Sequence, residues 1–163
     1  MAKQYRVGPF VRISNAVTKG LLRLGVPLET FSILVVRGRK SGRPIETPVA
    51  VFCEDGHRYL IASYGIVNWV RNLRAADGDA VLKRRRAEHI HAVELPPEPA
   101  SVILRAALHS GPPAIPKPVV RFYRRYFVLP YLDVGLESPP EDFRRAVADH
   151  PVFRVEAAAD PSG

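Results

Sequence analysis

The chain has 163 residues, of which 47% are hydrophobic and 25% charged, and this composition excludes a disordered protein and is typical of one globular domain. It has no apolar run of about 18 residues, so we expect no transmembrane helix, and Met1–Tyr5 lacks a signal-peptide core, which favours the cytoplasm. The formal net charge of +8 indicates an acidic partner, which could be nucleic acid, an anionic lipid or a polyanionic small molecule.

An N-terminal segment, residues 1–27, contains an expected amphipathic helix at 9–24 that ends before Gly25 and Pro27. Its basic side chains lie off the apolar face, so the helix could touch a membrane surface, although packing on the domain is the interpretation we favour. The apolar face consists of Phe10, Ile13, Val17, Leu21 and Leu24.

The middle of the chain predicts short strands joined by hairpins. Runs rich in β-branched residues alternate with turn signals such as Asp55-Gly56. The lone Cys53 allows no internal disulfide, and its apolar neighbours predict a small buried residue. The expected strands cover residues 31–36, 47–53, 59–62, about 80–85 and 87–95, with a short helix at 67–76.

Helices and a closing strand are expected after Pro96, and residues 157–163 should be a frayed tail. Short hairpin-connected strands with helices packed around them predict one α+β domain, residues 1–163, built on a small and mostly antiparallel barrel. The expected helices cover 99–110, 119–129 and 141–149, and the closing strand covers 151–155.

The most informative motif is the segment 37–43, Arg37-Gly38-Arg39-Lys40-Ser41-Gly42-Arg43, here called the basic turn. Its glycines allow positive φ, so that backbone N–H groups could converge on an anion, and its arginines suit phosphate or carboxylate. It is not a Walker P-loop, because Leu34 and Arg39 stand where glycines are needed. The alternative is a solvated hairpin tip.

A second motif surrounds the only tryptophan. On the helix at 67–76, Asn68, Arg71 and Asn72 share one face, which could present donors to a ligand near the helix start. For Trp69 alone, a place in the core is the interpretation we favour.

Three segments within residues 31–76 occur in a fixed order: Val35-Val36 with the basic turn and Pro44, then Thr47-Pro48-Val49, then Asn68-Trp69-Val70-Arg71-Asn72-Leu73. In this order they resemble the deazaflavin-dependent nitroreductase family of actinobacteria. The later segment His150-Pro151-Val152-Phe153-Arg154 also resembles members of that family.

The resemblance implies a split β-barrel of the flavin-reductase and pyridoxamine-phosphate-oxidase kind, which holds coenzyme F420, a deazaflavin with a phosphate and an oligoglutamate tail. FMN or FAD is the less favoured cofactor. Arg37, Arg39, Lys40, Ser41 and Arg43 would hold the phosphate and tail. Thr47, Pro48 and Val49 would run along the ring, and Ala62, Ser63, Tyr64 and Gly65 would approach it. Asn68, Trp69, Arg71 and Asn72 would complete the pocket.

The implied function is hydride transfer between reduced coenzyme F420 and a small electron-poor substrate such as a quinone, an enone or a nitro compound. The alternative is a non-catalytic split-barrel protein that binds a flavin, heme or lipid. We expect a monomer or homodimer in the cytoplasm, and the N-terminal helix leaves contact with a membrane open. The substrate-side candidates are Ser63, Tyr64, Tyr123 and Tyr126. Tyr123, Tyr126 and Tyr131 could cap the substrate and donate a proton after hydride transfer, but core packing explains these three tyrosines equally well or better.

Two other clusters give weaker signals. His89 and His91 could share a face of one strand, but no Cys or third His completes the set, so we expect no metal site. The segment 83–86, Lys83-Arg84-Arg85-Arg86, could touch a nucleic-acid backbone. No aromatic residues interleave with it, so we interpret it as a barrel corner and expect no nucleic-acid partner.

Overall fold

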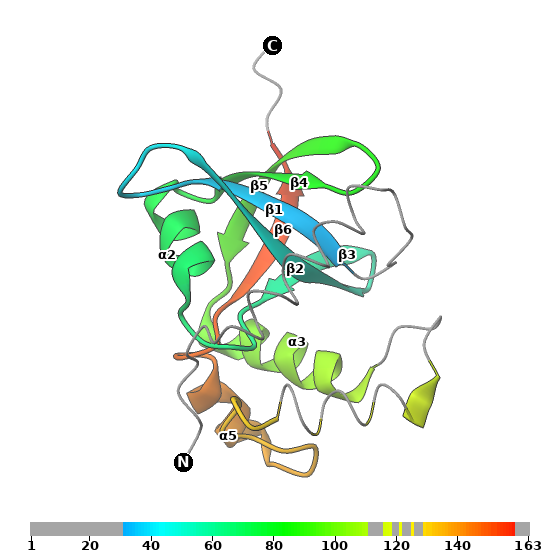
Figure 1. The fold of residues 1–163 in the computed structure, drawn as a ribbon. Helices are drawn as coiled ribbons and strands as arrows, with labels where there is room; N and C mark the ends of the chain where they lie inside the picture. The colour runs from blue at the N-terminus through cyan, green and yellow to red at the C-terminus, as the bar shows by residue number, and fades with distance from the viewer. Residues whose placement is uncertain (1–30, 111–115, 119–120, 122–124, 126–128, 159–163) are drawn as a thin grey trace.

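The computed structural model describes residues 31–110, 116–118, 121, 125 and 129–158. In this part of the chain six strands close into a barrel in the order β1-β2-β3-β6-β5-β4 (Figure 1). Every neighbouring pair of strands is antiparallel. The expected α+β fold, a small antiparallel barrel with flanking helices, is confirmed.

The elements follow the expected order with small shifts at their ends. Ala157 closes the last strand and therefore does not begin a frayed tail, while residues 159–163, the expected helix 9–24 and most of the expected helix 119–129 lie outside the described residues. The elements are β1 (Phe31–Arg37), β2 (Pro44–Glu54), β3 (His57–Ile61), α2 (Asn68–Ala75), β4 (Asp79–Lys83), β5 (Ala87–Glu94), α3 (Pro97–His109), α5 (Pro140–Ala146) and β6 (Val152–Ala157).

The first core fills the barrel. Because successive side chains of a strand point to opposite faces, Leu34 and Val36 of β1 share the inner face. They pack with Leu60, Ile90 and Phe153 from three other strands, and all five side chains are almost completely buried. Burial of a side chain of this size contributes about 1.5–3 kcal/mol, so this cluster is a main source of the barrel's stability.

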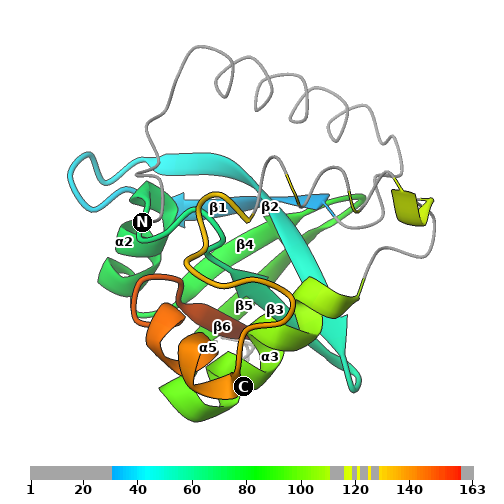
Figure 2. The same cartoon turned by 90° about the horizontal axis from the view of Figure 1, so that it is seen from below.

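A second core lies between the outer face of the barrel and the helices α3 and α5, which are below the strands in Figure 1 and in front of them in Figure 2, where the molecule is seen from below. Phe143 of α5 is completely buried there, together with Leu104 of α3. The barrel contributes Tyr59 and Val152, which point away from the first core. The two helices thus cover the outer face of the barrel at β3 and β6, and α2 lies on another side, close to the basic turn (Figure 1).

Cys53 is exposed, so the prediction of a buried thiol is wrong. The alternation of β2 puts Cys53 on the same face as Val49 and Val51, which contact the barrel core. Cys53 lies further along, opposite Arg58 and next to the hairpin turn at Asp55 and Gly56, beyond the reach of that core. An apolar run in the sequence therefore extends past the end of the buried region.

Candidate functional site

The basic turn joins β1 to β2 and is held by hydrogen bonds within itself. The amide of Gly38 donates to the Arg43 carbonyl at 2.8 Å, and the amide of Gly42 donates to the Gly38 carbonyl at 2.8 Å. Gly42 has φ +67°, a left-handed value that favours glycine. A Cβ on Gly38 would lie 2.7 Å from both Ser41 Oγ and Ile45 Cδ1 and 3.3 Å from the Arg43 carbonyl oxygen, so the side chains of Ser41 and Ile45 would have to move.

These internal bonds change how the turn could hold an anion. The amide of Arg43 donates to Ser41 Oγ at 3.3 Å, and the amide of Arg39 donates to a side chain on α2. With the amides of Gly38 and Gly42 also occupied, four amides of the turn are bonded within the protein, which leaves those of Lys40 and Ser41 for an anion. Recognition of an anion by this turn would therefore combine these two amides with the side chains of the turn.

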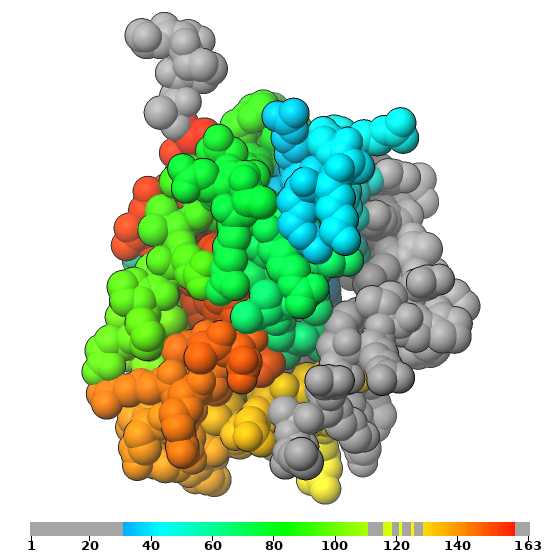
Figure 3. Space-filling view, turned by 90° about the vertical axis from the view of Figure 1, so that its left-hand side faces the viewer, coloured from blue at the N-terminus to red at the C-terminus, as the bar shows by residue number. Residues whose placement is uncertain are grey.

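Arg39 joins the basic turn to α2. The Oδ1 atom of Asn72 accepts the backbone amide of Arg39 at 3.3 Å and its Nη1 at 2.7 Å. Asn68 Oδ1 accepts the Nη2 of the same guanidinium at 3.5 Å, the long limit of a hydrogen bond. Asn72 is only 2% exposed, so this link is buried at its base. The two sequence motifs therefore form one surface, on which the turn lies against α2 (Figure 3).

The cations of this surface lack acidic partners among the described residues. Arg37, Arg39, Lys40, Arg43 and Arg71 are all exposed, and none of them forms an ion pair with a described carboxylate. By contrast, Arg74, at the other end of α2, donates to both oxygens of Glu94 at 2.7 and 2.9 Å. Those hydrogen bonds raise the pKa of Arg74, as expected for a cation with a carboxylate beside it.

A second segment predicted to reach the ligand, residues 62–65, follows β3. Ala62 is buried in the barrel core, and Gly65 turns the chain toward α2 with φ +86°. Ser63 and Tyr64 are half-buried, and the ring of Tyr64 meets that of Tyr131 edge to face at 5.2 Å. This ring contact brings Tyr131, 67 residues further along the chain, next to the segment 62–65. No spacing in the sequence indicated that the two segments would meet.

Of the residues on β2 and α2 that were predicted to contact the cofactor, some lie in the barrel core and others at the surface. Val49 packs inside the barrel core, whereas Pro48 points to the opposite face of the strand, so Thr47, Pro48 and Val49 do not present one continuous surface of side chains. Trp69 packs against the same core with its ring 5.9 Å from that of Phe153. This confirms the core interpretation for Trp69, which stays partly exposed. Tyr123 and Tyr126 lie outside the described residues.

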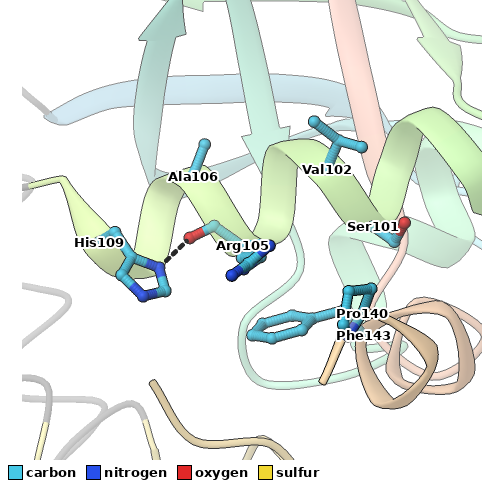
Figure 4. A pocket seen from close by; sticks show the side chains of 7 residues that line it. All are labelled: Ser101, Val102, Arg105, Ala106, His109, Pro140 and Phe143. Carbon is cyan, nitrogen blue, oxygen red and sulfur yellow. Dashed lines mark hydrogen bonds between the residues drawn. The ribbon is translucent and has the colours of Figure 1, made fainter. Parts of the chain in front are cut away.

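Two pockets lie away from the predicted site. One of about 330 Å³ opens between α3 and α5, where His109 donates a ring N–H to the Arg105 carbonyl at 2.8 Å (Figure 4). The other, of about 260 Å³, lies at the segment 83–86, here called the basic corner, next to Ile33 and Glu46. Neither is lined by a predicted site residue. The lining of the first is Ser101, Val102, Arg105, Ala106, His109, Pro140 and Phe143.

Within the described residues no group of three or more His, Cys, Asp or Glu side chains is placed to hold a metal ion. His91 instead lies with Nδ1 3.2 Å from Asp79 Oδ1. Among the described helices, none has the length and apolar character needed to cross a bilayer.

Several solved structures are similar to this chain. A protein described as a domain-swapped dimer is 19% identical, with a TM-score of 0.50, and the match covers 91% of this chain and 100% of that one. An F420-H2 dependent reductase is 20% identical over 78% of this chain and 94% of its own, with a TM-score of 0.46. A FAD-binding protein from Mesorhizobium loti is 15% identical over 85% and 88%, with a TM-score of 0.45.

A search of curated protein sequences gives no match. The profile of one family, the F420H(2)-dependent quinone reductases, matches residues 10–113. This range contains the basic turn, the segment 62–65 and α2, and it covers well over half of the chain. The chain therefore belongs to the F420H(2)-dependent quinone reductase family, and it is an oxidoreductase whose cofactor is coenzyme F420.

Proposed function

We propose that the protein transfers a hydride between reduced coenzyme F420 and a small electron-poor acceptor, of the quinone, enone or nitro class. One observation carries the placement of the cofactor: the guanidinium of Arg39, fixed by Asn72, lies among exposed cations that have no acidic partner in the described part of the chain. A surface of this kind is suited to an anionic ligand, since the ligand would supply the missing counter-charge.

The residues present fit the acidic end of the cofactor. Coenzyme F420 carries a phosphate and several carboxylates, and the basic turn offers Arg37, Lys40 and Arg43 beside Arg39. Asn72 and Asn68 each take one N–H of the Arg39 guanidinium, so its remaining N–H groups are available to a phosphate. Single exposed ion pairs contribute only about 0–1 kcal/mol, so we expect tight binding to require several of these cations together.

The other predicted residues would serve the reacting end. The bound coenzyme supplies the hydride chemistry, and the protein orients it and excludes water. Thr47 and Pro48 would lie along the ring, and the segment 62–65 would approach it, with Ser63 and Tyr64 toward the substrate. Val49 would support the ring from within the core, and Trp69 and Arg71 would complete the pocket. Asn72 would act through Arg39 rather than by touching the cofactor.

A binding comparison tests this proposal. Coenzyme F420, FMN and FAD would each be titrated into the purified protein, and the fluorescence of Trp69, the only tryptophan, would be followed. We expect quenching by coenzyme F420 at the lowest concentration. Anaerobic mixing of the reduced coenzyme with a quinone, an enone or a nitro compound should then oxidise it. Preferential quenching by FMN contradicts the placement of this cofactor, and binding without turnover of any acceptor supports the non-catalytic alternative.

A further inference from the structure

His150 is a buried histidine that none of the preceding roles uses. Its side chain is 5% exposed, and its Nδ1 lies 2.9 Å from the carbonyl oxygen of Ala62. A carbonyl can only accept a hydrogen bond, so Nδ1 carries the proton and donates it. The contact connects the residue just before Pro151 and β6 with the end of β3, across 88 positions of sequence.

The same carbonyl holds the segment 62–65 together. Ala62 O also accepts the amide of Gly65 at 2.9 Å, so that one oxygen closes the turn and receives His150. On the other side, the amide of Ala62 donates to the carbonyl of Pro151 at 3.0 Å. Residues 150 and 151 therefore hold Ala62 by both of its backbone polar groups, immediately before Ser63 and Tyr64.

Two buried polar side chains of the described residues make bonds of this long-range kind. Asn72 fixes the basic turn across 33 positions, and His150 fixes the segment 62–65 across 88. Burial of a polar side chain costs free energy unless it is hydrogen-bonded, and an apolar residue could fill the space at His150 without that cost. Each of these two bonds fixes the position of a segment that is predicted to contact the cofactor or the substrate.

We propose that His150 is a positioning residue, whose Nδ1–H bond to the Ala62 carbonyl orients Ser63 and Tyr64 toward the reacting end of the cofactor. The inference rests on the proposed function, since that function puts the segment 62–65 beside the ring. It extends that function by separating two tasks. The basic turn determines how tightly the coenzyme is held, and His150 determines how fast the held coenzyme reacts.

Two substitutions of similar size separate the hydrogen bond from packing. In His150→Asn the amide nitrogen occupies the place of Nδ1 and can still donate to Ala62, whereas His150→Leu has no donor. A tenfold change in rate corresponds to about 1.4 kcal/mol, which lies within the range for the loss of one hydrogen bond. We expect His150→Leu to lower kcat about tenfold with the Kd for coenzyme F420 within about threefold of wild type, and His150→Asn to keep kcat within about threefold.

Amide hydrogen exchange gives a readout that needs no cofactor. The Gly65 amide, which donates to Ala62 O, should exchange about tenfold faster in His150→Leu and near the wild-type rate in His150→Asn. If His150→Leu does not fold, His150→Phe keeps the ring volume without the donor and replaces it. Equal kcat loss in both variants, or an unchanged kcat in the variant without a donor, overturns the proposal. If the wild type binds no coenzyme F420, the proposed function fails by itself, and unchanged Gly65 exchange in all variants overturns the His150 inference separately.

Discussion

The basic turn and the basic corner are two hairpin connections of nearly the same charge but different construction. In the basic turn, bonds between Gly38, Gly42 and Arg43 close the loop, and Asn72 holds Arg39 from a buried position on α2. The basic corner has one loop bond, from the Arg84 amide to the Arg86 carbonyl at 3.2 Å, and its Lys83 is paired with Glu46 at 3.5 Å. Both connections are thus densely charged, but within the described residues only the basic turn has a cationic side chain held in position by a buried residue.

The largest effect should come from removing cations in each region. We expect Arg39→Ala combined with Lys40→Ala to weaken binding of coenzyme F420 by up to about 30-fold at low salt, because two cations that each contribute up to about 1 kcal/mol are lost. The matched control, Arg84→Ala combined with Arg85→Ala, removes the same charge and should change the Kd less than about threefold. Equal losses in the two double variants, measured by Trp69 quenching, would show that net charge alone attracts the cofactor.

A substitution that leaves the charge unchanged isolates the geometry of the turn. Gly38→Ala places a Cβ 2.7 Å from Ser41 Oγ and Ile45 Cδ1, so both side chains must move, and Ser41 Oγ then leaves the Arg43 amide to which it is bonded. We expect the Kd for coenzyme F420 to rise about tenfold, which corresponds to about 1.4 kcal/mol. Gly135→Ala is the control, because its nearest neighbour, Ser138 Oγ, would be 4.0 Å away. Normal binding by Gly38→Ala would mean that the shape of the turn is unimportant.

Removal of the hydrogen bonds that join the basic turn to α2 should have a smaller effect on the affinity for coenzyme F420. Asn72→Ala leaves the amide and Nη1 of Arg39 without their acceptor, and we expect the Kd to rise about fivefold and the free energy of unfolding to fall by about 1–3 kcal/mol. Asn68→Ala removes one exposed bond at the 3.5 Å limit and should leave both quantities nearly unchanged. Chemical denaturation and Trp69 quenching measure the two effects, and a larger loss in Asn68→Ala contradicts the structure.

The smallest expected effect is on stability, from loss of the ion pair between Arg58 and Glu88 near the basic corner. Arg58 donates to both oxygens of Glu88 at 2.6 and 2.8 Å, and these bonds lower the pKa of Glu88 below its ordinary value of 4.5. A lowered pKa in the folded state means that the pair stabilises the protein above pH 4.5 and ceases to do so as the pH falls through the folded pKa. We therefore expect Glu88→Gln to be less stable than wild type at neutral pH and equally stable in strong acid. Because the pair is exposed, the difference should stay below about 1 kcal/mol and shrink with salt; a difference that grows in acid would contradict this sign.

The sequence by itself determined the order of strands and helices, because hydrophobic periodicity and turn residues act over a few neighbouring positions. Asp55 and Gly56 both take the positive φ values expected of a hairpin turn, and the alternation of Leu34 and Val36 gives the inner face of β1. The exposure of Cys53 could not be predicted in this way, since the local sequence pattern does not show where the packed core ends. The candidate cations were also evident from the sequence, since charge and glycine spacing are local properties.

Only the tertiary structure decided how the two motifs combine. That Asn72 would turn inward to hold Arg39, and that His150 would donate to Ala62, depends on hydrogen bonds between segments 33 and 88 residues apart. No periodicity of the chain encodes such pairs, because they form when the closed barrel brings β1, β3 and β6 to fixed positions. The sequence thus indicated which groups could meet an anion, and the barrel decided which of those groups are held in place and which atoms hold them.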